Sequence, residues 1–234
     1  MKIAVIVPAF NEEKSIASVV GDIQKVATEN NFNIDIIVVN DCSIDATSEI
    51  ISKLNCIAIH LPVNLGIGGA MQTGFKFAYE NEYDFAIQID GDGQHPANEI
   101  PKLLVAQKES NADVVIGSRF LNNKGFQSTT LRRTGINYFR ILNKFFTGVN
   151  ITDSTSGFRL LNKKTLEFVC EYYPDEYPEP EAIVLYAKKK LNIVEVSVEM
   201  MARQGGTSSI GFFSSIYYMW KVSLGIIFTF IRTK

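Results

Sequence analysis

Short runs of strand-forming residues alternate along this chain with segments whose apolar residues recur every three or four positions. A parallel pair of strands needs a long crossover connection, and that crossover is usually a helix. The alternation therefore predicts an α/β domain with a mainly parallel, Rossmann-like sheet flanked by helices. The strand-like runs cover residues 3–7, 35–39, 57–60, 85–89, 113–117 and 193–198.

Composition and charge narrow the classes of function. A chain of 234 residues can build one large domain with a full hydrophobic core, or one domain and a tail. The formal net charge of -2 argues against a nucleic-acid partner, which would require a basic surface. Cys42, Cys56 and Cys170 form no C-x-x-C pair and no signal-peptide pattern opens the chain, so we expect reduced thiols and a cytosolic domain.

Two carboxylates one residue apart follow the strand-like run at 85–89. Ligands of open α/β sheets bind at the edge where the strands end. Asp90-Gly-Asp92 would place there the hard oxygen ligands that Mg²⁺ or Mn²⁺ prefers, with coordination positions left for substrate phosphates. A turn rich in Asp and Gly explains the spacing alone equally well. An EF-hand loop starting at Asp90 is excluded, because His95 stands where glycine is needed and Pro101 where glutamate is needed.

Acidic residues also follow the first two strand-like runs. Glu12 and Glu13 precede a helix-like segment, where they either complement the positive end of the helix dipole or bind a base or ribose edge. Asp41 follows the second run, at the same predicted sheet edge. Its carboxylate either accepts hydrogen bonds from the N–H groups of uracil or guanine, or caps a helix.

Glycines at 66, 68 and 69 open a further helix-like segment and invite comparison with dinucleotide-binding loops. The register fails, because the sixth position of G-x-G-x-x-G counted from Gly66 is Met71, and no Gly-Lys-Ser/Thr follows for a P-loop. We interpret these glycines as a turn whose backbone N–H groups come close to a nucleotide, or as small residues that let a helix pack closely on a strand.

Arginines are candidates for phosphate contacts because the planar guanidinium donates hydrogen bonds in pairs. Arg119 follows the fifth strand-like run at the same edge, and Arg133 lies in the next helix-like segment. Arg203 opens a stretch, residues 203–209, that is rich in glycine and hydroxyl side chains. Such a composition is typical of a lid over an anionic ligand, and a flexible linker is the alternative.

Two glutamates stand in a proline-rich segment that begins a helix-like run, Pro178-Glu-Pro-Glu181. Proline is tolerated in the first helical turn, where its missing N–H has no intrahelical partner. Glu179 or Glu181 is a candidate general base. Acidic residues in a first helical turn are also favourable without any catalysis, because they complement the helix dipole.

The segment 212–231 is apolar or aromatic apart from a few hydroxyl residues and Lys221. Its length of about 20 residues is near the minimum for a membrane span. Lys221 in the middle and the aromatic cluster at 217–220 favour instead a helix that lies at the membrane surface or against partner chains. Packing onto the domain is a further alternative.

Several motifs together resemble the family 2 glycosyltransferases, and within that family the branch of dolichyl or polyprenyl phosphate mannose and glucose synthases. The resemblance covers nearly all of residues 1–210, and the order and spacing of the motifs make it specific. The motifs are Val7-Pro-Ala-Phe-Asn-Glu-Glu13, Asn40-Asp-Cys-Ser43 with Asp45, Asn64-x-Gly66, Asp90-Gly-Asp-Gly-Gln-His-Pro96, Gly117-Ser-Arg119, Ser156-Gly-Phe-Arg159 and Arg203-x-x-Gly206-x-Ser208.

The resemblance implies the type A glycosyltransferase fold, a nucleotide diphosphate sugar donor linked to UDP or GDP, Mg²⁺ or Mn²⁺, and inversion at the anomeric carbon. It implies an enzyme that moves the sugar to a polyprenyl phosphate or to a growing cell-surface glycan. The residues it points to are Pro8, Glu12 and Asp41 for the nucleoside, Asp90, Asp92 and Gln94 for the metal and sugar diphosphate, Arg119 and Arg133 for the anionic acceptor or leaving group, and Arg203 in the lid.

Two departures from the family pattern matter. The family often has Asp-Asp-Gly-Ser where this chain has Asn40-Asp41-Cys-Ser, so the base contact rests on Asp41 alone. The catalytic carboxylate of many relatives falls near the two glutamates, and we prefer Glu181 to Glu179 narrowly. If the acceptor is a lipid phosphate, no base is needed, and the glutamate would orient the sugar.

The resulting expectation is a catalytic domain over residues 1–209 and a membrane-proximal helical tail over 210–234. The tail would hold the enzyme at the inner face of the plasma membrane and offers a surface for oligomers. Two alternatives stay open. A sugar-1-phosphate nucleotidyltransferase shares the general fold, but its glycine-rich signature after the first strand is missing. A non-catalytic, nucleotide-binding subunit at a membrane is the other alternative.

Overall fold

A single mixed sheet forms the centre of the molecule. The computed structural model describes residues 1–122, 130–175, 177–201 and 212–233, and within them the strand order is β3-β2-β1-β4-β6-β5-β7. The strands are β1 (Ile3–Ala9), β2 (Ile34–Asn40), β3 (Ile57–His60), β4 (Phe85–Gln88), β5 (Val114–Ser118), β6 (Arg159–Asn162) and β7 (Ile193–Ser197).

The first four strands run parallel, as the alternating pattern predicts. β6 is the exception, because it lies antiparallel between β4 and β5, while β7 pairs with β5 in parallel. The mainly parallel sheet is therefore confirmed. β6 was not among the predicted strands, because it has only four residues and its first residue is a buried arginine.

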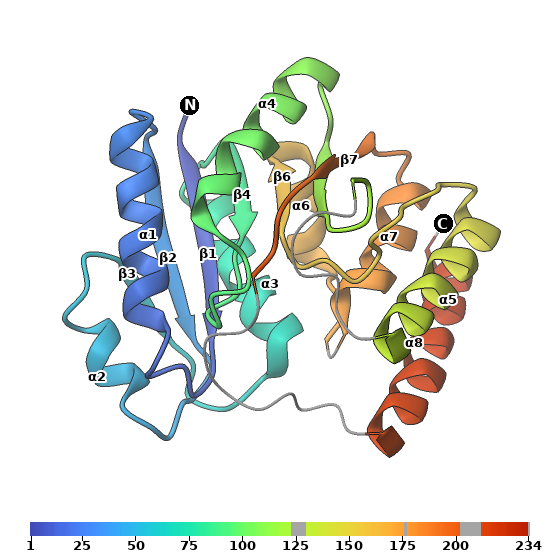
Figure 1. Cartoon of the computed structure of the whole chain (residues 1–234), viewed down its shortest axis with the longest axis horizontal. Helices are drawn as coiled ribbons and strands as arrows, with labels where there is room; N and C mark the ends of the chain where they lie inside the picture. The colour runs from blue at the N-terminus through green and yellow to red at the C-terminus, as the bar shows by residue number, and fades with distance from the viewer. Residues whose placement is uncertain (123–129, 176, 202–211, 234) are drawn as a thin grey trace.

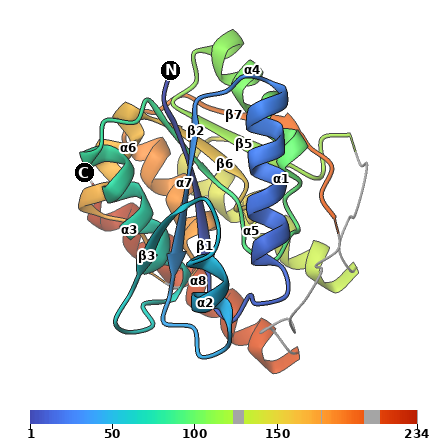
Figure 2. The same cartoon turned by 90° about the vertical axis from the view of Figure 1, so that its left-hand side faces the viewer.

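Helices cover both faces of the sheet (Figures 1 and 2). α1 and α4 pack on one face with alternate residues of β1, and α3, α6 and α7 pack on the other. Because both faces are buried, the central strands are apolar throughout instead of alternating. The helices on the two faces are α1 (Ile16–Glu29), α4 (Ile100–Ser110), α3 (Gly66–Glu80), α6 (Lys163–Glu171) and α7 (Pro178–Lys188). Shorter pieces are α2 (Thr47–Ile51) and η1 (Ala97–Glu99).

Two further helices, α5 (Thr130–Thr147) and α8 (Phe212–Arg232), lie outside α7 at the flank of the molecule (Figure 1). Phe139 of α5, Val184 of α7, and Val222 and Ile226 of α8 form a small core of their own. The predicted tail thus packs on α5 and α7. Among the residues that the structure describes, none of the helices is long and apolar enough to cross a membrane.

Candidate active site

The carboxyl ends of the first strands bring the predicted nucleoside residues to one edge. Pro8 is buried in β1, where it pairs with Val39 of β2. A Cβ added to Gly91, in the loop after β4, would lie 2.9 Å from the Pro8 carbonyl oxygen and 3.5 Å from Cγ of Glu12. The loops that follow β1 and β4 therefore touch at this point, and only a glycine at position 91 allows the approach.

Glu12 takes part in the loop structure before α1. Its side chain accepts a hydrogen bond of 2.7 Å from the Ser15 hydroxyl, and its backbone N–H donates to the Thr47 hydroxyl. The second bond joins the loop after β1 to the start of α2. Glu12 therefore stands at the predicted nucleoside edge with its carboxylate oriented by Ser15, the residue before α1.

Asp41 follows β2 and is 3% exposed. Its two carboxylate oxygens accept hydrogen bonds from the backbone N–H groups of Leu65 and Gly66, at 2.7 and 2.9 Å. These groups are at the start of α3, where free N–H groups attract negative charge. The capping role considered from the sequence is therefore present, and the carboxylate stands at the predicted base-binding position as well.

The glycines of this turn serve close packing. The N–H of Gly68 donates to the carbonyl oxygen of Asp175 at 2.7 Å, and a Cβ at Gly68 would collide with the carbonyl oxygens of Pro174 and Asp175. α3 thereby meets the loop that leads into α7. The close-packing interpretation of these glycines therefore holds at Gly68.

Asp90 stands at the end of β4 with its side chain one-third exposed. Its Oδ1 accepts a hydrogen bond of 3.3 Å from the Gln88 amide. The backbone N–H of Asp90 donates to Nδ1 of His95 at 3.1 Å, so the proton of the neutral ring is on Nε2. His95 is buried and stacks on Phe158, with ring centroids 5.4 Å apart. The histidine thus fixes the loop and leaves the Asp90 carboxylate open to solvent.

Asp92 is 4% exposed and accepts a hydrogen bond of 2.9 Å from the backbone N–H of Gln94. The Gln94 carbonyl accepts in turn from the N–H of Met201, 3.0 Å away. The chain after β7 therefore returns to the Asp90–Gln94 loop. Arg203 and the rest of the predicted lid lie outside the described residues.

The donor set fits a divalent cation that shares its coordination with substrate phosphates. Asp90 and Asp92 provide hard oxygens, and Asp90 retains acceptor positions beyond its bond to Gln88. The described part of the chain gathers no group of three His, Cys, Asp or Glu side chains that would hold a metal by itself. One or two carboxylates with phosphates completing the shell is the usual arrangement for Mg²⁺.

Arg119 is bound to a buried carboxylate. Its Nε and Nη2 donate to the two oxygens of Asp153, both at 2.7 Å, and Nη2 also contacts the Thr155 hydroxyl. The Asp153 side chain is fully buried and that of Arg119 is 10% exposed. Burial acts to lower the pKa of Arg119, but its bonds to Asp153 outweigh burial and raise the pKa. This pairing fixes the guanidinium at the sheet edge. Arg133, in contrast, is an exposed residue of α5.

Arg159 is a site residue whose role the sequence analysis did not identify. It is 1% exposed and donates to the carbonyl oxygens of Ser156 at 2.7 Å, Ser154 at 3.1 Å and Glu179 at 2.9 Å. It therefore ties the polar loop before β6 to the first turn of α7. The motif ending in Arg159 was visible in the sequence, but a charged residue gives no signal that it is buried.

Glu179 is the glutamate near the end of β4, because its carbonyl oxygen accepts from Arg159, which pairs with Gln88. Burial raises the pKa of its carboxyl, Arg159 and the Gln88 amide act to lower it, and the charge of Asp90 acts to raise it. A carboxyl that interacts with Gln88, Asp90 and Arg159 lies at the end of β4, beside the predicted sugar diphosphate. Burial also raises the pKa of Tyr186, farther along α7, to about 12.

Glu181 faces the opposite way. The Thr229 hydroxyl of α8 donates to its carboxylate at 3.5 Å, and Gly225 of α8 lies directly against it. Our narrow preference for Glu181 from the sequence does not fit this placement, because two residues along a helix point in directions about 200° apart. We therefore revise the preference to Glu179.

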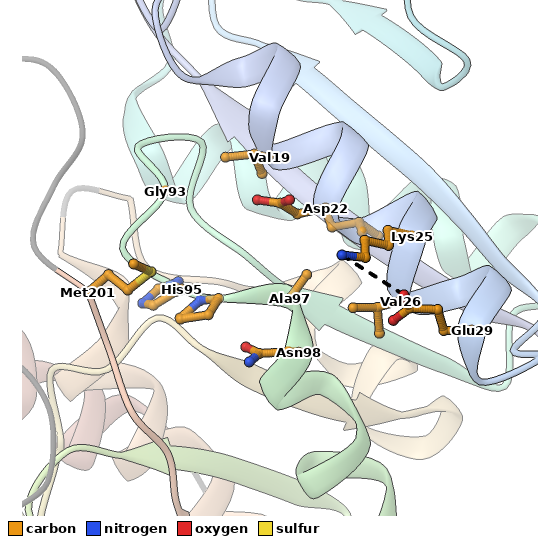
Figure 3. Close-up of a pocket in the computed structure, with 12 residues that line it drawn as sticks. Val19, Asp22, Lys25, Val26, Glu29, Gly93, His95, Ala97, Asn98 and Met201 are labelled. Carbon is orange, nitrogen blue, oxygen red and sulfur yellow. Dashed lines mark ion pairs between the residues drawn. The ribbon is translucent and has the colours of Figure 1, made fainter.

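A hollow of about 270 Å³ lies beside this edge, between α1 and residues 93–98 (Figure 3). Asp22, Lys25 and Glu29 of α1 line it, with His95 from the loop after β4 and Met201. Lys25 and Glu29 form an ion pair of 3.9 Å within it. Asp41, Asp90 and Glu179 are not among its lining residues, so this hollow is separate from the predicted donor site.

A mainly parallel sheet with one antiparallel strand, and with acidic residues after β1, β2 and β4, is the arrangement expected of the type A glycosyltransferase fold. Among solved structures, glucosyl-3-phosphoglycerate synthase from Mycobacterium tuberculosis, in complex with Mn²⁺, uridine diphosphate and phosphoglyceric acid, superposes with a TM-score of 0.71 at 17% identity, covering 100% of this chain and 79% of that chain. TarS of S. aureus in complex with UDP-GlcNAc gives a TM-score of 0.65 at 22% identity, covering 97% and 67%. These likenesses confirm the predicted fold.

Residues 4–169 match glycosyl transferase family 2, and the chain belongs to that family. It is 34% identical over 245 residues to the UDP-N-acetylglucosamine–dolichyl-phosphate N-acetylglucosaminyltransferase of Methanococcus voltae, covering 92% of this chain and 93% of the relative. It is 30% identical over 175 residues to the undecaprenyl-phosphate mannosyltransferase of Micrococcus luteus, covering 72% and 70%. The predicted family and the prediction of a glycosyltransferase are confirmed.

Proposed function

We propose that this chain transfers a sugar, with inversion, from a nucleoside diphosphate sugar to a polyprenyl phosphate at a membrane surface. The observation that carries the proposal is the similarity to the Methanococcus voltae enzyme, which extends over 92% of this chain. The carboxylates assembled at one sheet edge by β1, β2 and β4 support a nucleotide sugar donor. We place the enzyme on the inner face of the plasma membrane, where a lipid acceptor and a cytosolic donor meet.

Donor binding is assigned to the first half of the sheet. Pro8, Glu12 and Asp41 border the nucleoside, with the Asp41 carboxylate already oriented by the N-terminus of α3. Asp90 and Asp92, with Gln94 beside them, would hold Mg²⁺ or Mn²⁺ against the diphosphate. When bound, the cation neutralises negative charge that develops on the departing nucleoside diphosphate.

The acceptor side is assigned to Arg119, Arg133 and Glu179. A guanidinium held by Asp153 is a fixed positive charge, and such preorganised charge stabilises an anion without reorganisation during the reaction. A lipid phosphate is ionised near neutral pH, so its attack on the anomeric carbon from the face opposite the leaving group needs no base. Glu179 then orients the sugar, because it stands beside Asp90 and Gln88.

The test is transfer from a panel of UDP-, GDP- and TDP-sugars, with Mn²⁺ or Mg²⁺, to a short-chain polyprenyl phosphate. We expect one nucleotide to raise the unfolding temperature and one of its sugars, UDP-N-acetylglucosamine first, to appear in an acid-labile lipid product. Tight nucleotide binding without transfer to the lipid phosphate would contradict the proposal. Transfer to a sugar hydroxyl in place of the phosphate would contradict the assigned acceptor only.

A further inference from the structure

The outward sides of α5 and α8 carry apolar residues at helical spacing. Trp220, Phe228 and Ile231 of α8 are 63%, 64% and 71% exposed, and Ile141 and Phe145 of α5 are 61% and 80% exposed. Residues three, four, seven, eight or eleven apart share one side of a helix. Each helix therefore presents an apolar stripe to the outside. We call these two stripes together the α5–α8 face.

This face is not part of the core of the molecule. The inner sides of the two helices pack on α7 through Phe139, Val222 and Ile226, which are fully buried. The helices also bind one another, because the hydroxyls of Tyr138 and Ser223 are 2.9 Å apart. The inner sides thus account for folding of this layer. The two helices themselves lie on the flank of the molecule, outside α7 (Figure 1).

The charge of the same two helices is one-sided. Residues 130–147 and 212–232 contain six basic residues and no acidic residue, although the whole chain has a formal net charge of -2. Lys144 and Arg232 are exposed at the ends of the two helices. Aromatic residues together with Lys and Arg on one helical surface are typical of helices that lie in the interface of an anionic bilayer.

We infer that the α5–α8 face lies on the surface of an anionic lipid bilayer. The inference rests on the proposed function, since a polyprenyl phosphate is presented at such a surface. A second copy of the chain is the other occupant to consider. A twofold interface would bring the same patch together from both copies, and the cations would then face cations without acidic partners. An anionic surface has the complementary charge.

The face is joined to the candidate active site through α7. Gly225 and Thr229 of α8 contact Glu181 on one side of α7, and Glu179 at the start of that helix faces Asp90. Tyr218 of α8 also packs on Tyr177, the residue before α7, with ring centroids 4.5 Å apart. A bilayer bound to α5 and α8 is thereby held in a fixed relation to the first turn of α7.

The experiment is flotation of the full chain with vesicles of pure phosphatidylcholine and of an equimolar mixture with phosphatidylglycerol. We expect binding to the anionic vesicles, weakened by added salt because exposed charges are screened. Trp220→Glu and Phe145→Glu are each expected to weaken that binding at least about tenfold, and Lys144→Glu at least about fivefold. Val105→Glu, at a 53% exposed position of α4, is the matched control and should bind like the wild type.

Three results would overturn the inference: no binding of the wild type to anionic vesicles, equal loss in Val105→Glu, or unchanged binding in all three α5–α8 variants. A concentration-dependent dimer that Trp220→Glu abolishes would make a second copy the occupant.

Transfer to a water-soluble short-chain acceptor separates this inference from the proposed function. It should be unchanged in Trp220→Glu, while transfer to an acceptor embedded in anionic vesicles should fall at least about tenfold. Absence of transfer in every format, with vesicle binding intact, would contradict the proposed function alone.

Discussion

The half of the sheet built by β1 to β4 and the half built by β5 to β7 hold their charged residues in different ways. In the first half, carboxylates stand in loops and are oriented by backbone N–H groups, as Asp41 is by Leu65 and Gly66. In the second half, the buried arginines are held by acceptors of the protein itself, as Arg119 is by Asp153 and Arg159 is by three carbonyl oxygens. The first arrangement orients carboxylates at an edge where a ligand can bind, whereas in the second the Asp153 carboxylate is used within the protein to hold Arg119. Glu179 belongs to both halves, because it comes from α7, after β6 in the chain, but interacts with Asp90 at the end of β4.

The largest effect on activity is expected for Asp92→Asn in the first half. The variant keeps the size of the side chain but removes the charge proposed to hold the cation, so transfer should fall by at least about a thousandfold. The unfolding temperature should change little, because the hydrogen bond from Gln94 can still be accepted. Initial rates with Mn²⁺ and a thermal unfolding curve measure both.

Asp22→Asn is the control for this variant, since Asp22 is an exposed carboxylate of α1 that lines the separate hollow. It should leave both rate and stability unchanged. If Asp92→Asn transferred sugar at the wild-type rate, the comparison of the two halves would fail. The buried Asp92 carboxylate of the first half would then be structural and would not bind a ligand.

The largest effect on stability is expected for Asp153→Ala in the second half. Removal of one partner leaves the Arg119 guanidinium buried without its bidentate acceptor, which costs about 3–5 kcal/mol of the free energy of unfolding. Denaturant unfolding of wild type and variant measures the difference. Glu29→Ala, which breaks the exposed pair with Lys25, is the control and should cost less than about 1 kcal/mol.

A loss of less than about 1 kcal/mol in Asp153→Ala would show that the pair is not structural. Arg119 and Asp153 would then belong with the ligand-binding residues of the first half. A double replacement of Arg119 by Met and Asp153 by Leu sharpens the comparison. It should recover much of the stability, because no buried charge is left without a partner, but it should remain inactive if Arg119 contacts the acceptor.

Glu179→Gln and Glu181→Gln test whether Glu179, which interacts with Asp90 of the first half, is the glutamate that acts at the site. We expect transfer to fall about a hundredfold for Glu179→Gln, because its carboxylate is placed to orient the sugar beside Asp90, and by less than about threefold for Glu181→Gln, which faces α8. The measurement is kcat and KM for the donor. Equal losses, or a larger loss at Glu181, would contradict the assignment of Glu179.

The sequence predicted the first half of the molecule closely, for a physical reason. Strands buried on both faces leave short continuous apolar runs, and an amphipathic helix leaves a pattern with a period of 3.6 residues; α1 buries the apolar residues that its pattern indicates. Acidic residues that follow parallel strands must then meet at one edge. Asp41, Asp90 and the loop before α1 do meet there, and their ligand roles remain predictions.

The second half depends on contacts that no local pattern encodes. β6 is short and begins with Arg159, whose burial is possible only because three carbonyl oxygens from distant segments accept its hydrogen bonds. The orientation of Glu179 and Glu181 depends on where α8 packs, which the apolar pattern of residues 212–231 leaves undetermined. The packing of α5 with α8 is likewise a tertiary contact that no local pattern of the sequence indicates.

The smallest expected effect concerns Asp113, which joins the ends of β5, β6 and β7 at the edge opposite the site. Its carboxylate accepts hydrogen bonds from the Asn192 N–H at 2.8 Å, the Asn162 amide at 2.9 Å and the Lys164 ammonium at 3.1 Å. Burial acts to raise the pKa of Asp113, but these bonds outweigh it and lower the pKa below its ordinary value. A lowered carboxyl pKa stabilises the fold above the ordinary pKa, and that stability is lost as the pH falls through the lowered pKa.

Asp113→Asn should therefore cost about 2 kcal/mol of the free energy of unfolding at neutral pH, because a charged acceptor of three hydrogen bonds becomes a neutral one. The difference from the wild type should shrink in acid, where the wild-type carboxyl is itself protonated. Denaturant unfolding of both proteins across the acid range measures the trend. A difference that stays constant with pH would mean that the hydrogen bonds stabilise this edge through geometry alone. Rates of transfer should be unchanged at neutral pH, because a paired charge of the second half that lies away from the site serves only the fold.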